Sequence, residues 1–179
     1  MRIISGIHKG RRIHAPNNLP VRPTTDRAKE ALFNILNHQM YFENLKVLDL
    51  FAGTGNISYE FISRGVHQAT CVDKNMKCIR FIEQTANALE ANIEAIQTDV
   101  ISFLSQHRST YDIIFADPPY DSDFEIFESM ITLILSKNLL HDGGLLILEH
   151  SKQTDLSSLP KYSDSRVYGS CVFSFFKTN

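Results

Sequence analysis

The stretch KVLDLFAGTG (46–55) decides the fold of this 179-residue chain. Its first half is a short apolar run, which predicts a buried strand, and its second half is a glycine-rich turn. A helical pattern follows over 58–64 and ends at Gly65. A strand, a tight turn and a helix in this order are typical of an α/β domain with a parallel sheet.

The same alternation continues toward the C-terminus. Strand patterns alternate with helical patterns. The expected strands cover 69–73, 93–98, 111–116 and 145–150. The expected helices cover 75–91, 99–107 and 124–134. Strands that are almost entirely apolar belong to a parallel sheet covered on both faces. Residues 166–177 differ, because two β-rich pieces flank Gly169 and Ser170 with no helix between them. They predict an antiparallel hairpin at a sheet edge.

The N-terminal side predicts smaller elements. Residues 1–15 alternate loosely around Gly6 and Gly10, which predicts one or two short strands that form a β-hairpin. Thr24 or Thr25 can cap a helix within TTDRAKEALFNILNH (24–38). We therefore expect a single domain over 1–179, with a Rossmann-like seven-stranded sheet. Residues 1–22 would form a basic extension, and residues 24–179 the catalytic core.

Charge is distributed unevenly along the chain. The net charge is −2, but the first thirty residues carry seven Lys and Arg against Asp26 and Glu30, whereas the remainder is acidic. A basic end on an acidic body can bind nucleic-acid phosphates, although a solvated surface hairpin explains the charge equally well. The candidate contacts for RNA are Arg2, Lys9, Arg11, Arg12, Arg22 and Arg27.

Composition excludes several classes of protein. No apolar run approaches the roughly 20 residues that cross a bilayer, and the N-terminus lacks the apolar segment of a secretory signal. The three cysteines, Cys71, Cys78 and Cys171, show no metal-ligand spacing. We expect a cytoplasmic monomer with reduced cysteines, no bound metal and no membrane partner.

The glycine-rich turn predicts a ligand site. Gly53 and Gly55 allow the backbone to approach a ligand at the carboxyl end of the first strand. A dinucleotide-binding turn would have a third glycine where this chain has Ser58. The anionic Asp49 suits a ligand with an amine and a positive sulfonium better than a pyrophosphate.

Two further carboxylates follow the next strands. Asp73 lies 20 residues after Gly53, where an acidic residue accepts hydrogen bonds from ribose hydroxyls. Its alternative role is to cap the helix that starts near Asn75. Asp99 can accept a hydrogen bond from an adenine amino group, or it can cap its own helix, and the two roles are equally well supported.

Asp117-Pro118-Pro119-Tyr120 (DPPY) carries the clearest chemical signal. An aryl amine is a poor nucleophile because its lone pair is delocalised into the ring. The Asp117 carboxylate and the Pro118 carbonyl can accept its two N–H bonds and localise that lone pair. The prolines fix the loop, and Tyr120 offers a face on which an extruded base can stack. The motif predicts methylation of an exocyclic amino group of a base.

Together these segments resemble the RsmD-type bacterial methyltransferases, which modify guanine N2 in small-subunit (16S) ribosomal RNA. The matching stretches occur in the family's order and span most of the chain. They are MRIISGIHKGRRI (1–13), VRPTTDRAKEALFNIL (21–36), DLFAGTG (49–55), DPPY (117–120) and YGSCVFSF (168–175).

The resemblance implies S-adenosylmethionine as the methyl donor and direct in-line transfer to a flipped guanine. It implies that rRNA, in an assembled or assembling ribosomal subunit, is the partner, and that Thr24 and Thr25 lie near the site. The implied cofactor contacts are Asp49, Phe51, Gly53, Gly55, Asp73, Asp99 and Val100. One departure from the family pattern is NISYEF (56–61), where small and aliphatic residues are usual.

Other readings are weaker. DNA adenine or cytosine amino-methyltransferases share a DPPY-type loop but usually carry an added target-recognition region. Protein glutamine methyltransferases usually have Asn in place of Asp117. A catalytically idle RNA-binding assembly factor would not need an intact DPPY loop, and a nicotinamide oxidoreductase is disfavoured by Ser58. Glu149 falls near the expected rim of the site, and the sequence assigns it no role.

Overall fold

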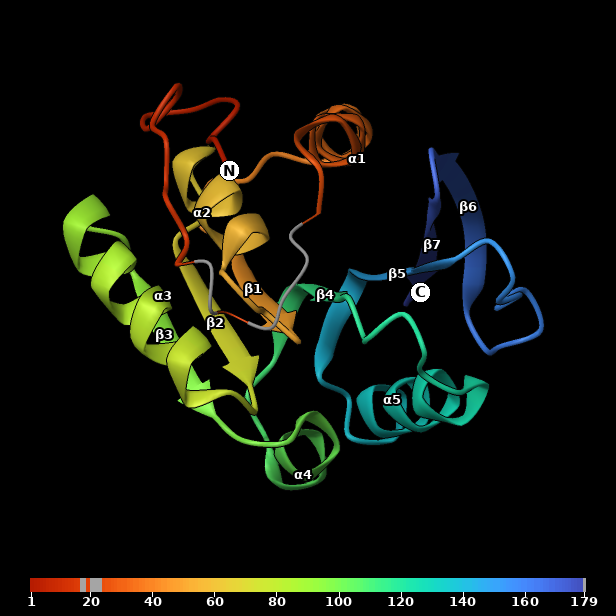
Figure 1. Ribbon diagram of the computed structural model, residues 1–179. Helices are drawn as coiled ribbons and strands as arrows, with labels where there is room; N and C mark the ends of the chain where they lie inside the picture. Colours follow the sequence, from red (N-terminus) through yellow and green to blue (C-terminus); the bar gives the residue numbers. More distant parts are fainter. Residues whose placement is uncertain (17–18, 20–23, 179) are drawn as a thin grey trace.

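The computed structural model describes residues 1–16, 19 and 24–178. It contains a seven-stranded sheet in the order β3-β2-β1-β4-β5-β7-β6, with helices on both faces (Figure 1). The strands are β1 (Lys46–Leu50), β2 (Gln68–Asp73), β3 (Ile93–Gln97), β4 (Tyr111–Ala116), β5 (Leu140–Ser151), β6 (Tyr162–Tyr168) and β7 (Cys171–Lys177). The helices are α1 (Asp26–Gln39), α2 (Asn56–Ser63), α3 (Met76–Leu89), α4 (Val100–Gln106) and α5 (Phe124–Ser136). The predicted fold class is confirmed.

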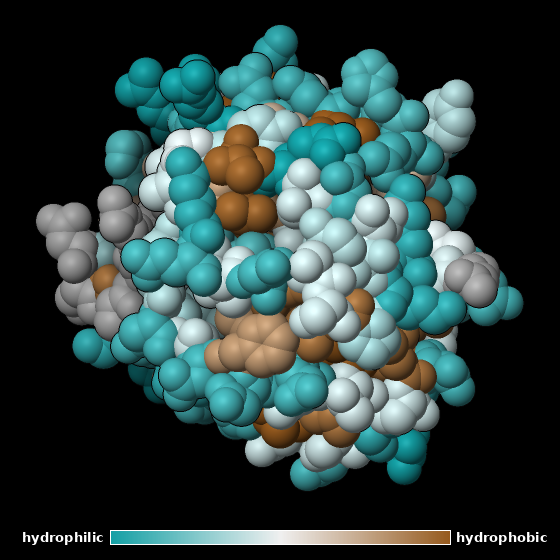
Figure 2. Space-filling model, turned by 90° about the vertical axis from the view of Figure 1, so that its right-hand side faces the viewer, coloured by the Kyte–Doolittle hydropathy of each residue, from teal (hydrophilic) through white to brown (hydrophobic). Residues whose placement is uncertain are grey.

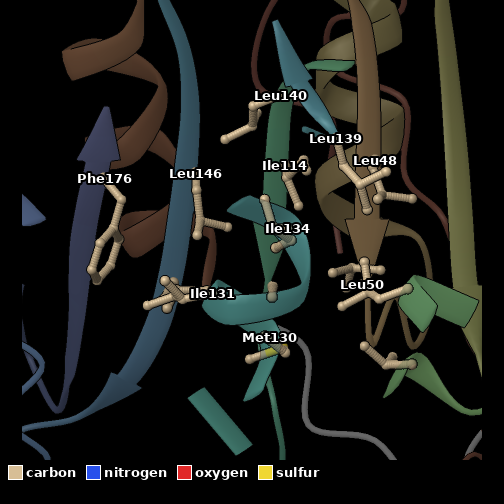
Figure 3. Packing of buried hydrophobic residues seen from close by; sticks show 14 of the residues in the cluster. Leu48, Leu50, Ile114, Met130, Ile131, Ile134, Leu139, Leu140, Leu146 and Phe176 are labelled. Atoms are coloured by element: carbon tan, nitrogen blue, oxygen red, sulfur yellow. The ribbon is translucent and has the colours of Figure 1, made fainter. Parts of the chain in front are cut away.

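Two apolar layers sandwich the sheet. Alternate residues of one strand face opposite layers, so Val47 packs against α1 and α2 while Leu48 and Leu50 pack against α4 and α5. Figure 1 shows these helix pairs on opposite sides of the sheet, and Figure 3 shows the α5 layer meeting Ile114 and Leu146 of the central strands. The parallel strands β1, β2 and β4 are therefore buried on both faces, as their apolar sequences predict, whereas the edge strand β3 is only partly buried.

The C-terminal hairpin is confirmed, and it extends the sheet beyond β5 with its second strand, β7, on the inner side. β7 pairs antiparallel with β5 over Leu145↔Lys177 to Ser151↔Cys171, and β6 forms the edge. An ion pair between Asp164 and Arg166 lies on this edge strand. Figure 2, which views the molecule from this side, shows hydrophilic residues over most of the surface with apolar atoms in separate groups. Charged side chains protect such an edge from pairing with another chain.

β5 begins earlier than its sequence predicts. The expected strand covered 145–150, whereas the observed strand starts at Leu140. The register jumps from Tyr111↔Leu140 to Ile113↔Leu145, so Gly143 and Gly144 lie in an irregularity of the strand. Gly143 has φ +74°, a conformation that glycine adopts without strain. The two glycines, which are typical of a turn in the sequence, therefore permit a β-bulge within the strand.

The N-terminal segment folds back on itself as expected, and backbone hydrogen bonds such as Ile3 to Arg11 join its two arms, but they form a single isolated β-bridge, Arg2↔Arg12, and no extended ladder. The Ile4 and Ser5 amides donate instead to the Glu60 carboxylate on α2, at 2.8 and 3.0 Å. These backbone donors bind a helix rather than a partner strand, so the β-ladder cannot lengthen. Among the described residues, no helix has both the length and the apolar character needed to span a membrane.

Candidate active site

A cavity of about 440 Å³ opens at the carboxyl ends of the central parallel strands. This edge of the sheet is where doubly wound folds bind ligands. The residues predicted to contact cofactor or base line this one cavity, with the exception of Gly55: they are Asp49, Phe51, Gly53, Asp73, Asp99, Val100, Asp117, Pro118, Pro119 and Tyr120. The fold thus brings together motifs that lie far apart in the sequence.

The glycine-rich turn is held by Asp73. The Gly53 amide donates to Asp73 Oδ2 at 2.9 Å, and the Asn75 amide donates to Asp73 Oδ1 at 2.8 Å. Asn75 itself caps α3, because its side chain accepts from the Lys77 amide. The capping role considered for Asp73 therefore belongs to Asn75. A carboxylate can accept more than two hydrogen bonds, so a ribose contact by Asp73 remains a prediction.

The same turn contains a strained backbone position. Phe51 has φ +58°, a left-handed conformation that costs energy in a residue other than glycine and tends to occur at ligand sites. Gly55, at φ +75°, contributes to packing: an added Cβ would lie 2.8 Å from the Tyr59 ring. Gly55 caps the N-terminus of α2 and brings the helix close beneath the turn.

Asp49 lies beneath the turn and is almost fully buried. Ser58 donates to its Oδ2 at 2.7 Å, so the residue that breaks the dinucleotide pattern holds this carboxylate. Burial raises the pKa of Asp49 to about 7, and the Ser58 hydrogen bond opposes the shift. A carboxyl group poised near neutral pH ionises readily when a cation comes close.

Asp99 caps α4, since its Oδ1 accepts from the Ser102 amide at 2.9 Å. The capping interpretation is therefore observed. Asp99 and the neighbouring Val100 also line the cavity, and their contact with a cofactor remains a prediction.

The DPPY loop lines the same cavity and begins beside β1, since the Asp117 amide donates to the Leu50 carbonyl at 3.3 Å. The Pro119 carbonyl accepts from the Ser122 amide at 2.9 Å, which tightens the loop. The Tyr120 side chain is 61% exposed, and its hydroxyl donates to the Ser170 carbonyl at 2.7 Å. The turn between β6 and β7 thus fixes an exposed aromatic ring at the rim. Burial raises the pKa of Asp117 well above its usual range, and the carboxylates of Glu149 and Asp49 raise it further.

Glu149 is the residue that sequence reasoning missed. It is only 6% exposed, and Thr24 Oγ1 donates to its Oε2 at 3.0 Å. Burial raises the pKa of Glu149, and the Thr24 hydrogen bond opposes the shift. Its position was a usable signal, because it lies near the carboxyl end of β5, at the same sheet edge where Asp49, Asp73 and Asp117 lie at or just beyond the ends of their strands.

Thr24 connects the two sides of the cavity. Its hydroxyl donates to Glu149, while its carbonyl accepts from Asn56 Nδ2 at 3.1 Å. Asn56 in turn accepts from the buried Lys29 Nζ at 2.8 Å. Asn56 belongs to NISYEF, so part of this departure from the family pattern serves to hold Thr24 against the cavity.

The structure shows which basic residues near the N-terminus are exposed. Arg2, Lys9, Arg11, Arg12 and Arg27 are exposed, as phosphate contacts must be, whereas Arg22 lies outside the described residues. Lys29, which contributes to the basic count, is buried against Glu60 and is not available to a partner. Arg11 and Arg12 border a second hollow against α3, of about 500 Å³.

Over most of its length, the chain is similar to known proteins. The family model described as "Conserved hypothetical protein 95" matches residues 1–177. YlbH of Bacillus subtilis is 33% identical over 161 residues, covering 87% of this chain and 85% of that protein. Ribosomal RNA small subunit methyltransferase D of Escherichia coli is 31% identical over 161 residues, covering 89% and 79%. The solved structure of yhhF from Escherichia coli superposes with a TM-score of 0.87 at 30% identity, covering 99% of this chain and 97% of that chain.

Proposed function

The chain belongs to the family described as "Conserved hypothetical protein 95", and on this premise we propose that it methylates N2 of a guanine in small-subunit (16S) rRNA, with S-adenosylmethionine as donor. One observation carries the proposal: the glycine-rich turn and the DPPY loop line a single cavity. A donor site and an amino-group acceptor site thereby adjoin, as direct transfer requires. Residues 24–179 act as the catalytic core of one domain, and the enzyme acts as a monomer.

The residues around the turn fit the proposed donor. S-adenosylmethionine, when bound, supplies an electrophilic methyl group on a positive sulfonium. The cavity offers the carboxylates of Asp49, Asp73 and Asp99, which suit a cation, an amine and ribose hydroxyls. Phe51 and Val100 add apolar surface for a base ring. The backbone of Gly53 lets the ligand approach closely.

The DPPY loop prepares the acceptor. The Asp117 carboxylate and the Pro118 carbonyl accept the two N–H bonds of guanine N2, which localises the lone pair on nitrogen. As the N–C bond to the methyl group forms, the bond between that methyl group and sulfur breaks and its electron pair stays on sulfur. The nitrogen becomes positive, and one of its protons passes to Asp117. No covalent bond to the enzyme is needed. Tyr120, whose ring is fixed by Ser170, stacks on the base. The base must leave its stack to reach this cavity.

The exposed N-terminal cations supply affinity for RNA. Arg2, Lys9, Arg11 and Arg12 lie on one short segment that is fixed to α2 through Glu60 and Ser63. Such a segment neutralises phosphates without reading sequence, so the binding depends on salt. We propose that an assembled or assembling ribosomal subunit presents the target nucleotide in the correct geometry.

The test is methyl incorporation from labelled S-adenosylmethionine into unmodified small subunits, naked small-subunit rRNA and DNA, followed by nucleoside analysis. We expect N2-methylguanosine in a ribosomal substrate and none with Asp117→Ala, which should still bind the donor. Label in DNA alone would instead indicate a DNA amino-methyltransferase. Donor binding without label in any substrate would favour an idle RNA-binding factor.

A further inference from the structure

The hollow between the N-terminal segment and α3 has a lining unlike that of the candidate active site. Four aspartates and a single lysine line the active-site cavity. The nine described residues that line the hollow include Arg11 and Arg12 and no acidic residue. His14 adds a third side chain that can carry a positive charge. Because opposite charges attract, the cavity suits a cationic ligand and the hollow suits an anionic one.

Two elements form the walls of this hollow. The chain over 11–14 runs beside α3, as the descending arm of the N-terminal segment in Figure 1 shows. The Arg11 guanidinium donates to the Ala88 carbonyl at 3.1 Å, and this bond ties the two walls together at the last turn of α3. Leu89 belongs to a buried cluster, and Ile13 packs against that cluster. These two side chains therefore give the hollow an apolar floor.

Phe81 contributes an aromatic ring to the same lining. The buried face of α3 consists of Cys78, Ile79, Ile82, Ala86 and Leu89. Phe81 is only partly buried, and among the described residues it belongs to none of the apolar clusters that form the core. Sites for single-stranded nucleic acid combine such a ring, on which a base stacks, with cations that follow the phosphates. Phe81, Arg11 and Arg12 form this combination within one hollow.

The hollow also lies on the helix that starts at the candidate active site. Lys74 and Asn75, just before α3, line the active-site cavity. Phe81 follows Asn75 by six residues, which corresponds to about 9 Å along the helix axis. Gln84 and Thr85, one turn further on, add side-chain hydrogen-bonding groups that can meet the edge of a base. A free inorganic anion would leave the ring and the apolar floor uncovered, whereas a nucleotide would cover both.

We propose that this hollow binds one nucleotide from a single-stranded stretch of the substrate RNA, with its base stacked on Phe81 and its phosphates paired with Arg11 and Arg12. This inference rests on the proposed function, which makes RNA the ligand of this surface. It adds contact with a base to a segment that otherwise binds phosphates alone. Every base has a face that can stack, so the hollow selects unpaired RNA and not a particular sequence. The target base and this nucleotide belong to the same strand, which follows α3 from the cavity to the hollow.

The test compares the binding of a single-stranded RNA oligonucleotide to three variants by fluorescence anisotropy. Phe81→Leu keeps an apolar side chain but removes the aromatic face, so we expect affinity to fall about tenfold. The slope of log K against log salt should not change, because no charge is lost. Phe81→Tyr keeps the face and should bind like wild type. Tyr41→Leu is the matched control, since Tyr41 is 93% exposed and lies outside the hollow, and its affinity should be unchanged. Thermal unfolding and affinity for S-adenosylmethionine should match wild type in all three.

Three results would overturn the inference. Wild-type affinity in Phe81→Leu would show that no base stacks on the ring. An equal loss of affinity for inorganic polyphosphate, which has no bases, would show that the substitution only disturbs the arginines. The same loss with fully duplex RNA would show that the hollow receives no unpaired base. These assays measure binding and not turnover. If wild-type enzyme methylated no guanine, the proposed function would fail, while the comparison of Phe81→Leu with Phe81→Tyr would still report on the hollow.

Discussion

Lys29 Nζ lies 3.4 Å from the Glu60 carboxylate, and neither side chain is exposed. Arg64 donates to the same carboxylate at 2.8 Å, and the amides of Ile4 and Ser5 complete its shell. Burial lowers the pKa of Lys29, and Glu60 opposes the shift. This ion pair joins α1, α2 and the N-terminal segment, so it couples the proposed RNA-binding surface to the fold.

Removing one partner of this pair should be costly. In Glu60→Gln, Lys29 would be a buried cation without its anion, and we expect a loss of about 3–5 kcal/mol in the free energy of unfolding, measured in urea. Asp164→Asn is the control, because it breaks the largely exposed pair with Arg166 and should cost no more than about 1 kcal/mol. Equal losses in the two variants would contradict the structural role of the buried pair.

Gly6 should anchor the N-terminal segment to α2. A Cβ at Gly6 would lie 1.6 Å from the Ser63 carbonyl oxygen, so Gly6→Ala must displace the segment. Gly10→Ala is a matched control, since Gly10 has the same φ of +83° with nothing within 4 Å of the added Cβ. We expect Gly6→Ala to weaken RNA binding in a filter or fluorescence assay far more than Gly10→Ala. Affinity for S-adenosylmethionine should be unchanged in both.

Affinity for S-adenosylmethionine should rise with pH toward neutrality. The pKa of Asp49 is about 7, so the free protein retains this proton below pH 7, and a bound cation favours its release. Affinity should therefore increase by up to about tenfold per pH unit below pH 7, and level off above it. Calorimetry in buffers of different ionisation enthalpy would detect the released proton. Asp49→Asn should bind more weakly and without this pH dependence.

The same shift has a consequence for stability. Without ligand, the folded protein holds a proton on Asp49 that the unfolded chain releases at a lower pH. Stability should therefore fall as pH rises from about 4 to about 7 through this group. Asp49→Asn should gain stability relative to wild type over this range, as judged by urea unfolding at several pH values.

Arg11 and Arg12 should contribute separate phosphate contacts. Each change to Ala should weaken RNA binding and reduce the slope of log K against log salt by about 1. The control is Arg108→Ala, an exposed cation just after α4, on the opposite face of the sheet from the N-terminal segment (Figure 1). A salt slope unaffected by Arg11→Ala and Arg12→Ala would remove this segment from the RNA interface.

The parallel sheet and its ligand edge were predictable because their signals are local. The KVLDL run and the glycine-rich turn set a strand and its ending, and the carboxyl ends of parallel strands share one edge. DPPY follows the neighbouring strand, so its place beside Asp49 follows from topology alone. Ser58 was recognised as a break in the dinucleotide pattern, but its hydrogen bond to Asp49 was not foreseen.

The missed features depend on distant partners. The place of Glu149 at the ligand edge could be read from its position after the apolar run of β5, but its hydrogen bond from Thr24, 125 residues away, could not. The sequence could not show that the β-ladder between the N-terminal arms is so short. The amides of Ile4 and Ser5 donate to Glu60, which lies 56 and 55 residues away. The early start of β5 was missed because the pair Gly143-Gly144 is typical of a turn. Only the register with β4 shows that the pair lies within the strand.

The acidic lining of the cavity bears on the direction of the catalytic cycle. Asp49, Asp73, Asp99 and Asp117 line the cavity that we propose for a donor that arrives with a positive sulfur and leaves as a neutral thioether. Methyl transfer removes the positive charge on sulfur, and with it the attraction between that charge and the carboxylates. This electrostatic contribution therefore favours binding of the fresh donor over the spent one.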